Sequence, residues 1–152
     1  MIPRARGPVR SRSEENVLEE LHRLAEAGYR EVVLTAISLP SYGTDTGTCL
    51  AALVEKAAAV PGIERIRLGS LDPDMLTDAD IARLAAVEKL CPQFHLSLQS
   101  GCSKTLRAMR RPYTAEQYAE IAAKLRRAFG AENASFTTDV IVGFPGETEE
   151  DF

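Results

Sequence analysis

Apolar residues near the start of the chain follow a helical period and then change to the apolar run of a buried strand. Ser13, followed by Glu14 and Glu15, is typical of a helix N-cap with acids in the first turn. Residues 31–38, EVVLTAIS, are short and rich in β-branched side chains, so they predict a strand. Before that strand the pattern predicts a helix of about four turns that Gly28 ends, with apolar positions Val17, Leu18, Leu21, Leu24 and Ala25.

The alternation of helix and strand continues to the end of the chain. Thr48 is expected to open a second helix, and Thr77 and Thr114 each precede an acid or amide three residues later, the pattern of a capping box. Gly130 is expected to end the last long helix, and Thr148 to begin another. The strands predicted between the helices are IERIRLGS at 63–70, FHLSLQ at 94–99 and SFTTDVIVG at 135–143.

The order of elements predicts an α/β fold with a parallel sheet, because each connection is long enough for a right-handed crossover. A parallel strand covered on both faces should be apolar throughout, yet the strands at 94–99 and 135–143 alternate apolar with polar residues. One face of the sheet is therefore expected to line the lumen of a partial barrel. The alternative is an edge strand whose polar face meets solvent. We expect the lumen to hold His95, Gln99 and Asp139, and the helices to cover Phe94, Leu98 and Val140.

Composition narrows the class of protein. The 152 residues are 45% hydrophobic and carry a formal net charge of -4, which fits one soluble globular domain or part of one. No apolar run reaches the length of a membrane span, and the arginine-rich start lacks the apolar middle of a secretion signal, so we expect a cytoplasmic protein without a membrane partner. Cys49, Cys91 and Cys102 fit neither a disulfide framework nor a metal site and are expected to be reduced thiols.

Small and polar residues mark the carboxyl ends of the predicted strands, where α/β folds bind their ligands. These residues are Ser38, the pair Gly69 and Ser70, the run 99–101 (QSG) and the run 143–147 (GFPGE). Glycines let backbone approach a ligand closely, and the neighbouring polar side chains offer hydrogen bonds. The residues alone thus indicate a small polar cofactor, and they contain no metal or hydrolytic constellation.

Several ordered strings resemble the radical S-adenosylmethionine core of the methylthiotransferase family. They are IPRARGPVRSR, LGSLDPDMLTD, FHLSLQSGC, LRAMRRPYT and TTDVIVGFPGETEEDF, and together they span nearly the whole chain. The resemblance implies a TIM-like (β/α) partial barrel of the radical SAM type, without its first and closing strands. It also implies that residues 1–152 are a fragment of that core, with the cluster-binding cysteines immediately before Met1. The family's N-terminal domain and C-terminal RNA-binding domain are then absent from this chain.

The resemblance also implies an activity, cofactors and a partner. The family uses S-adenosylmethionine and [4Fe-4S] clusters to add a methylthio group to an aromatic carbon. The run 99–101 resembles the tRNA-modifying members, and IPRARG and SLDP resemble the enzymes that act at C2 of N6-threonylcarbamoyladenosine at tRNA position 37. Two alternatives stay open. One is the isopentenyladenosine-specific tRNA enzyme of the same family, and the other is an inactive α/β scaffold or interaction module. The fragment alone is expected to be inactive.

Site residues follow from the resemblance position by position, and all of them are expected to contact the cofactor. No residue of this chain is expected to be catalytic or to bind metal. Ser38 departs from the family's usual Asn or His, as Ala36 does from Gly, which changes the expected contact to the cofactor's amine. Arg4 and Arg6 are expected to meet phosphate or carboxylate or to form a solvated arm, and Cys102 to be a passive thiol. The expected cofactor-binding residues are Ser38, Gln99, Ser100, Asp139, Ile141 and Gly143.

Overall fold

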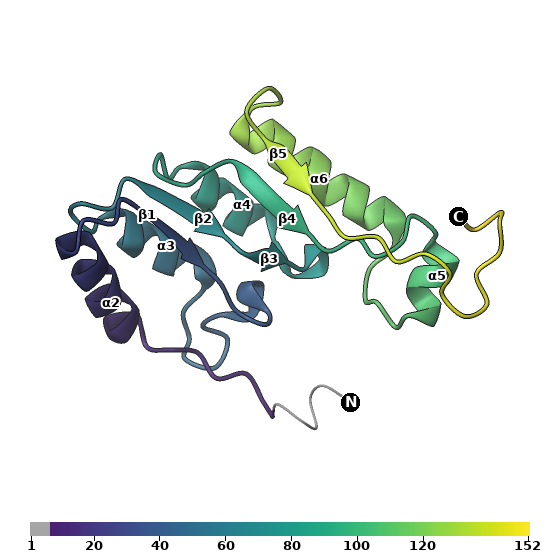
Figure 1. The fold of residues 1–152 in the computed structure, drawn as a ribbon, viewed down its shortest axis with the longest axis horizontal. Coiled ribbons are helices and arrows are strands. Elements are labelled where there is room, and N and C mark those ends of the chain that lie inside the picture. The colour runs from purple at the N-terminus through teal and green to yellow at the C-terminus, as the bar shows by residue number, and fades with distance from the viewer. Residues whose placement is uncertain (1–6) are drawn as a thin grey trace.

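The structure is a computed structural model that describes residues 7–152, so the expectations for Arg4 and Arg6 lie outside the described residues. The described residues form five α-helices, five strands and two short 3-10 helices, and helices and strands follow one another except that β3 comes directly after β2 and α6 after α5 (Figure 1). The helices are α2 (Glu14–Glu26), α3 (Leu50–Ala58), α4 (Asp78–Ala85), α5 (Ser103–Ala108) and α6 (Ala115–Phe129), and the 3-10 helices are η1 (Leu39–Ser41) and η2 (Pro73–Met75).

Helix starts that depend on local hydrogen bonds are confirmed. Ser13 Oγ accepts the N–H of Asn16 at 3.3 Å, and capping boxes form at Thr77 with Asp80 and at Thr114 with Gln117. After α6, Gly130 has a φ of 88°, as its expected role at a helix end requires.

Two expected helix starts are wrong. The N-cap of α3 is Cys49, because Thr48 instead donates its hydroxyl to Glu14 Oε1 of α2 at 2.8 Å. Thr148 begins a hydrogen-bonded turn rather than a helix, with its hydroxyl 2.9 Å from Asp151 Oδ2.

The strands are parallel and shorter than expected. They are β1 (Glu31–Leu34), β2 (Arg65–Leu68), β3 (Ser70–Leu71), β4 (Gln93–Leu96) and β5 (Ser135–Thr137). β1 pairs with β2, β3 with β4 and β4 with β5, all in parallel, and a parallel bridge between Ile66 and Leu90 links the two sets. Only Gly69 separates β2 from β3. A Cβ at Gly69 would lie 2.9 Å from Thr35 Oγ1, so a side chain there would collide with the end of β1.

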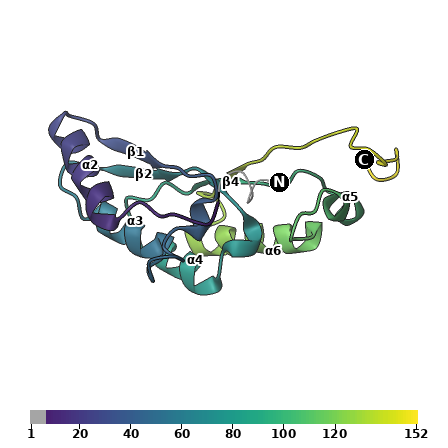
Figure 2. The same ribbon diagram turned by 90° about the horizontal axis from the view of Figure 1, so that it is seen from below.

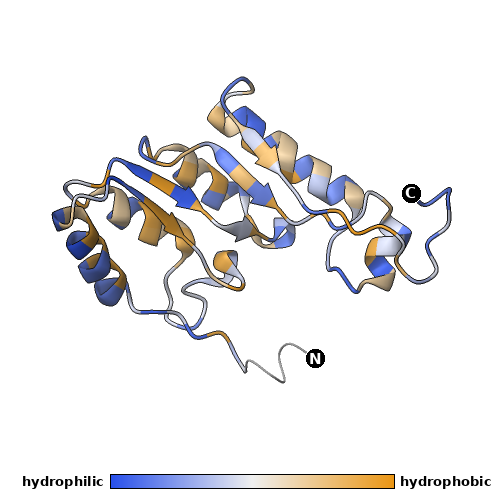
Figure 3. Ribbon diagram, in the orientation of Figure 1, coloured by the Kyte–Doolittle hydropathy of each residue, from blue (hydrophilic) through white to orange (hydrophobic). Residues whose placement is uncertain are grey.

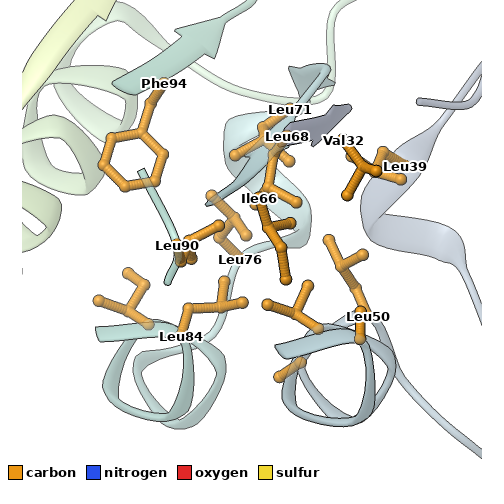
Figure 4. Packing of buried hydrophobic residues seen from close by; sticks show 14 of the residues in the cluster. Val32, Leu39, Leu50, Ile66, Leu68, Leu71, Leu76, Leu84, Leu90 and Phe94 are labelled. Carbon is orange, nitrogen blue, oxygen red and sulfur yellow. The ribbon is translucent and has the colours of Figure 1, made fainter. Parts of the chain in front are cut away.

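The helices α3, α4 and α6 lie on one side of the sheet and leave the opposite side without helices, as Figures 1 and 2 show together. Side chains of β2 point toward these helices and pack near Leu50 of α3 and Leu84 of α4 (Figure 4). Ile66, Phe94 and Leu96 are fully buried in this layer. The parallel α/β class is confirmed. No helix among residues 7–152 is long and apolar enough to cross a membrane.

The alternation expected along the strands is confirmed at β4, and residue hydropathy changes from position to position along the sheet (Figure 3). Phe94 is buried with its ring centroid 4.9 Å from that of Phe129 of α6, whereas His95 turns to the opposite face, toward Thr137 and Asp139. The expectation for Val140 is wrong, because its side chain is 55% exposed. Its neighbours Ile141 and Val142 are also exposed, at 45% and 62%, so no described element covers this segment on either face.

Candidate functional site

The continuations of β4 and β5 change register just beyond the regular sheet. His95 pairs with Thr137, and the next paired residues are Gln99 and Val140. The β4 side therefore uses four residues where the β5 side uses three, which makes a bulge with one extra residue in the β4 chain. Such a bulge redirects the side chains that follow it. The expected inward position of Val140 assumed an unbroken alternation.

The Thr138 hydroxyl bridges the backbone inside this bulge. Its Oγ1 accepts the N–H of Leu98 at 3.0 Å and donates to the carbonyl of Leu96 at 2.6 Å. The Tyr113 hydroxyl supports the same stretch by donating to the carbonyl of Ser97 at 2.5 Å, from a side chain that is buried. Burial raises the pKa of Tyr113, which keeps this hydroxyl in its donating form. Two side chains thus take over backbone bonds that the sheet cannot make there.

Three of the expected cofactor-binding residues, Gln99, Asp139 and Ile141, meet where the bulge ends, and we refer to them as the strand-end site. The N–H of Gln99 donates to the carbonyl of Asp139 at 2.9 Å, and the N–H of Ile141 donates to the carbonyl of Gln99 at 2.8 Å. Gln99 has a φ of 69°. The left-handed region costs a residue with a side chain about 1–2 kcal/mol, so the surrounding bonds must hold it.

The Asp139 carboxylate of the strand-end site lies on the helix-free face of the sheet. Its side chain is 76% exposed and its Oδ2 lies 3.5 Å from Nε2 of His95. On the other side of the ring, Nδ1 of His95 lies 3.0 Å from the Thr137 hydroxyl. An exposed acceptor with an imidazole beside it can bind hydroxyl or ammonium groups of a ligand.

Ser38 and Ser100 are placed differently from the strand-end site. Ser38 donates its hydroxyl to Asp72 Oδ2 at 3.3 Å, at the ends of β1 and β3. Ser100 is only 3% exposed, and its Oγ accepts the N–H of Cys102 at 3.1 Å. Its hydroxyl therefore closes the turn into α5, and the residue presents almost no accessible surface to a ligand.

The turn after β5 holds Gly143 in a fixed, open position. Gly143 has a φ of 72°, and a Cβ there would meet nothing within 4 Å. Glu147 Oε2 accepts the N–H groups of Gly143 at 2.6 Å and of Phe144 at 3.1 Å. One carboxylate thus closes the GFPGE turn and leaves open space beside Gly143.

A second carboxylate ties the end of the described chain to α5. Asp151 Oδ2 accepts from Lys104 Nζ at 2.7 Å and from the Thr148 hydroxyl, and its Oδ1 lies 3.5 Å from Cys102 Sγ. The bond from Lys104, together with those from Thr148, holds the pKa of Asp151 well below its usual range.

A cavity of about 540 Å³ lies between α2 and the free edge of β1, away from the strand-end site. Tyr29, Val33, Thr35 and Ser38 are among the residues that line it. It shares no lining residue with the ends of β4 and β5.

The residues present fit one of the two expected cofactors. S-adenosylmethionine carries an ammonium, a carboxylate, ribose hydroxyls and an adenine ring. The strand-end site offers it an exposed carboxylate, an amide and the half-exposed apolar side chain of Ile141. An iron-sulfur cluster is not matched, because residues 7–152 contain no group of three or more side chains able to hold a metal ion. Cys49, Cys91 and Cys102 are free thiols on three separate parts of the fold.

Sequence reasoning missed Thr138, Tyr113, Asp72 and Glu147. A signal existed for the first two. Thr138 is a polar residue among the apolar positions of its strand, and a buried tyrosine needs a partner for its hydroxyl. Asp72 and Glu147 act through contacts that no local pattern reveals.

Relatives of known name match the whole chain but only part of their own length. The chain is 42% identical to the tRNA-2-methylthio-N(6)-dimethylallyladenosine synthase of Acetivibrio thermocellus, and covers 32% of that protein. It is 43% identical to the protein of that name from Caldicellulosiruptor saccharolyticus and 40% identical to one from Clostridium botulinum, covering 32% and 34% of them. The chain thus spans about a third of the length of these curated relatives. The names of these relatives specify dimethylallyladenosine, whereas the resemblance predicts threonylcarbamoyladenosine.

Comparisons of fold and of family agree. A solved structure of the cobalamin-dependent S-adenosylmethionine radical enzyme OxsB matches 85% of this chain and 19% of its own, with a TM-score of 0.62 and 15% identity. This likeness agrees with the expected fold, a partial (β/α) barrel. The model of the radical SAM superfamily matches residues 1–152, and the chain therefore belongs to the radical SAM superfamily.

Proposed function

We propose that this chain is part of the radical SAM core of a tRNA methylthiotransferase. The observation that carries the proposal is the identity of 40–43% to tRNA methylthio-adenosine synthases along the whole chain. The chain covers about a third of each of those relatives. In this proposal the cluster cysteines, the N-terminal domain and the RNA-binding domain belong to the other two thirds and lie outside residues 1–152.

The substrate that we propose is the N6-dimethylallyl form of adenosine, also called isopentenyladenosine, at tRNA position 37. This replaces the N6-threonylcarbamoyl form expected from the sequence strings, because the relatives' names favour the alternative.

The residues of the strand-end site bind and orient S-adenosylmethionine in this proposal. Asp139 accepts hydrogen bonds from hydroxyl or ammonium groups, Gln99 offers both a donor and an acceptor, and the backbone and side chain of Ile141 lie along the adenine. The open space at Gly143 lets the ligand approach the turn closely. When bound to a cluster held by cysteines outside this chain, the cofactor supplies the radical that attacks an unreactive C–H bond.

The test is a modification assay on the full-length protein, purified without oxygen and reconstituted with iron and sulfide. It receives S-adenosylmethionine, a reductant, and tRNA that carries either isopentenyladenosine or threonylcarbamoyladenosine. Mass spectrometry of the digested nucleosides should find the methylthio group on isopentenyladenosine. Methylthio-threonylcarbamoyladenosine would restore the first expectation, and absence of both products together with absence of S-adenosylmethionine binding would favour the inactive scaffold.

A further inference from the structure

Gln99 is held in a left-handed conformation that its own side chain disfavours. Of the described residues with side chains, only Gln99 and Arg110 have a positive φ. A glycine would adopt the same backbone freely, so the presence of glutamine here needs a reason. Strained residues of this kind cluster at ligand sites, where surrounding bonds hold them in place.

Two hydroxyls hold the backbone of the bulge just before Gln99. Thr138 Oγ1 holds both Leu96 and Leu98, at 2.6 and 3.0 Å. Tyr113 holds the carbonyl of Ser97 at 2.5 Å, two residues before Gln99. Beyond the bulge, the N–H and carbonyl of Gln99 bond to Asp139 and Ile141, at 2.9 and 2.8 Å. The backbone is thus fixed immediately before Gln99 and at Gln99 itself.

We propose that Thr138 and Tyr113 are positioning residues that fix the backbone of Gln99 so that its amide faces S-adenosylmethionine beside Asp139. The inference rests on the proposed function and deepens it. In it, the two hydroxyls set the position of Gln99 in the cofactor site without contacting the cofactor themselves. Removal of the Tyr113 hydroxyl leaves the Ser97 carbonyl without this buried partner, and removal of the exposed Thr138 hydroxyl leaves Leu96 and Leu98 to water, which does not hold the two strands together. The strand ends then lose their register.

The decisive variants keep shape and change one hydrogen-bonding group. Thr138→Val removes the hydroxyl at nearly constant volume, Thr138→Ser retains it, and Tyr113→Phe removes the other hydroxyl. Tyr118→Phe, at a half-buried position of α6, is the matched control. Each is made in the full-length, cluster-loaded protein. The readouts are the dissociation constant of S-adenosylmethionine, the melting temperature, the iron content and hydrogen exchange at the amides of Gln99 and Ile141.

Thr138→Val should weaken S-adenosylmethionine binding about tenfold, because both hydrogen bonds of the hydroxyl are lost, and should speed exchange at both amides. Tyr113→Phe should act in the same direction, and Thr138→Ser and Tyr118→Phe should bind as the wild type does. Gln99→Gly should raise the melting temperature while weakening binding, because glycine accepts the left-handed backbone and offers the cofactor no amide. A purely structural role of Gln99 does not predict a higher melting temperature together with weaker S-adenosylmethionine binding.

Wild-type affinity in both Thr138→Val and Tyr113→Phe would overturn the inference, as would a loss of affinity in Thr138→Ser equal to that in Thr138→Val. A full-length wild-type protein that binds no S-adenosylmethionine would instead contradict the proposed function. The two failures are therefore distinguishable.

Discussion

At the scale of single residues, the alternating pattern of the strands was enough to place some side chains and not others. His95 and Asp139 share one face because both positions follow the period of the strands. Val140 escaped prediction because no described element covers residues 140–142. The conformation of Gln99 escaped prediction because it lies at the end of a one-residue bulge. The bulge depends on the hydroxyl of Thr138 and on Tyr113 from a distant segment, and no local rule contains that contact.

The first prediction concerns Asp139. Asp139→Ala in the full-length protein should weaken S-adenosylmethionine binding about tenfold to hundredfold, because a charge-assisted hydrogen bond contributes about 1.5–3 kcal/mol. Isothermal titration with the cluster-loaded protein measures this, and the iron content should not change. Asp45→Ala, in the exposed loop where Asp45 binds Ser11, serves as the control and should bind the cofactor normally. Equal affinities of the two variants for S-adenosylmethionine would show that Asp139 does not contact the cofactor.

At the scale of elements, sequence rules predicted the helix starts that depend on hydrogen bonds between neighbouring residues. The caps at Ser13, Thr77 and Thr114 were predictable because each side chain bonds within its own first turn. The start of α3 was not, because Glu14 of another helix binds Thr48. The strands at 94–99 and 135–143 were predicted too long because regular pairing ends at His95 and Thr137, where the bulge begins.

The second prediction concerns the packing of α4 on the sheet. Leu84 is 1% exposed and packs beneath β2 (Figure 4), so Leu84→Ala should lower the free energy of unfolding by about 2–5 kcal/mol. Leu84→Met conserves volume and should cost less than about 1.5 kcal/mol. Urea denaturation followed by circular dichroism measures both. A similar loss in both variants would show that Leu84 is not packed as described.

The third prediction concerns the contact between α2 and α3. Hydrogen bonds from Lys56 and Thr48 lower the pKa of Glu14 below its ordinary value of 4.5. A carboxylate with a depressed pKa stabilises the fold above its unfolded pKa and loses that effect as pH falls through the folded pKa. Glu14→Gln should therefore lower the melting temperature at pH 7, by about 1–3 °C, and the difference should be smaller at pH 3, where more of the carboxyl is protonated.

The control for that titration is Glu19→Gln, an exposed position on the same helix, whose melting temperature should follow that of the wild type at both pH values. A gap for Glu14→Gln that is equally large at pH 3 would mean that the carboxylate charge is not what joins α2 to α3.

At the scale of the whole molecule, the order of strands and helices sufficed to predict a parallel α/β fold with one helix-free face. Composition alone could not assign the cofactor, because the polar strand ends are compatible with many small ligands. The resemblance supplied the family, and of the two modified adenosines the relatives' names favour the alternative over the one expected. The expected substrate rested on the short strings IPRARG and SLDP. The residue types in these strings do not show which group of the substrate they would contact.

The fourth prediction follows from the separation of the cysteines. The 152-residue chain, reconstituted anaerobically with iron and sulfide, should hold no stable [4Fe-4S] cluster and cleave no S-adenosylmethionine, since the three thiols lie on separate parts of the fold. Absorbance near about 400 nm, where such clusters absorb, and release of 5′-deoxyadenosine measure this. The full-length protein is the positive control. A stoichiometric cluster in the short chain would show that its ligands have been misplaced.

The most direct test of the central claim is a crystal structure of the full-length protein with S-adenosylmethionine bound. The account predicts the cofactor across the carboxyl ends of β4 and β5, with Asp139 and Gln99 within hydrogen-bond distance of its polar groups and Ile141 along the adenine. A cofactor bound elsewhere, for example in the cavity between α2 and β1, with no contact to Asp139 or Gln99, would contradict it.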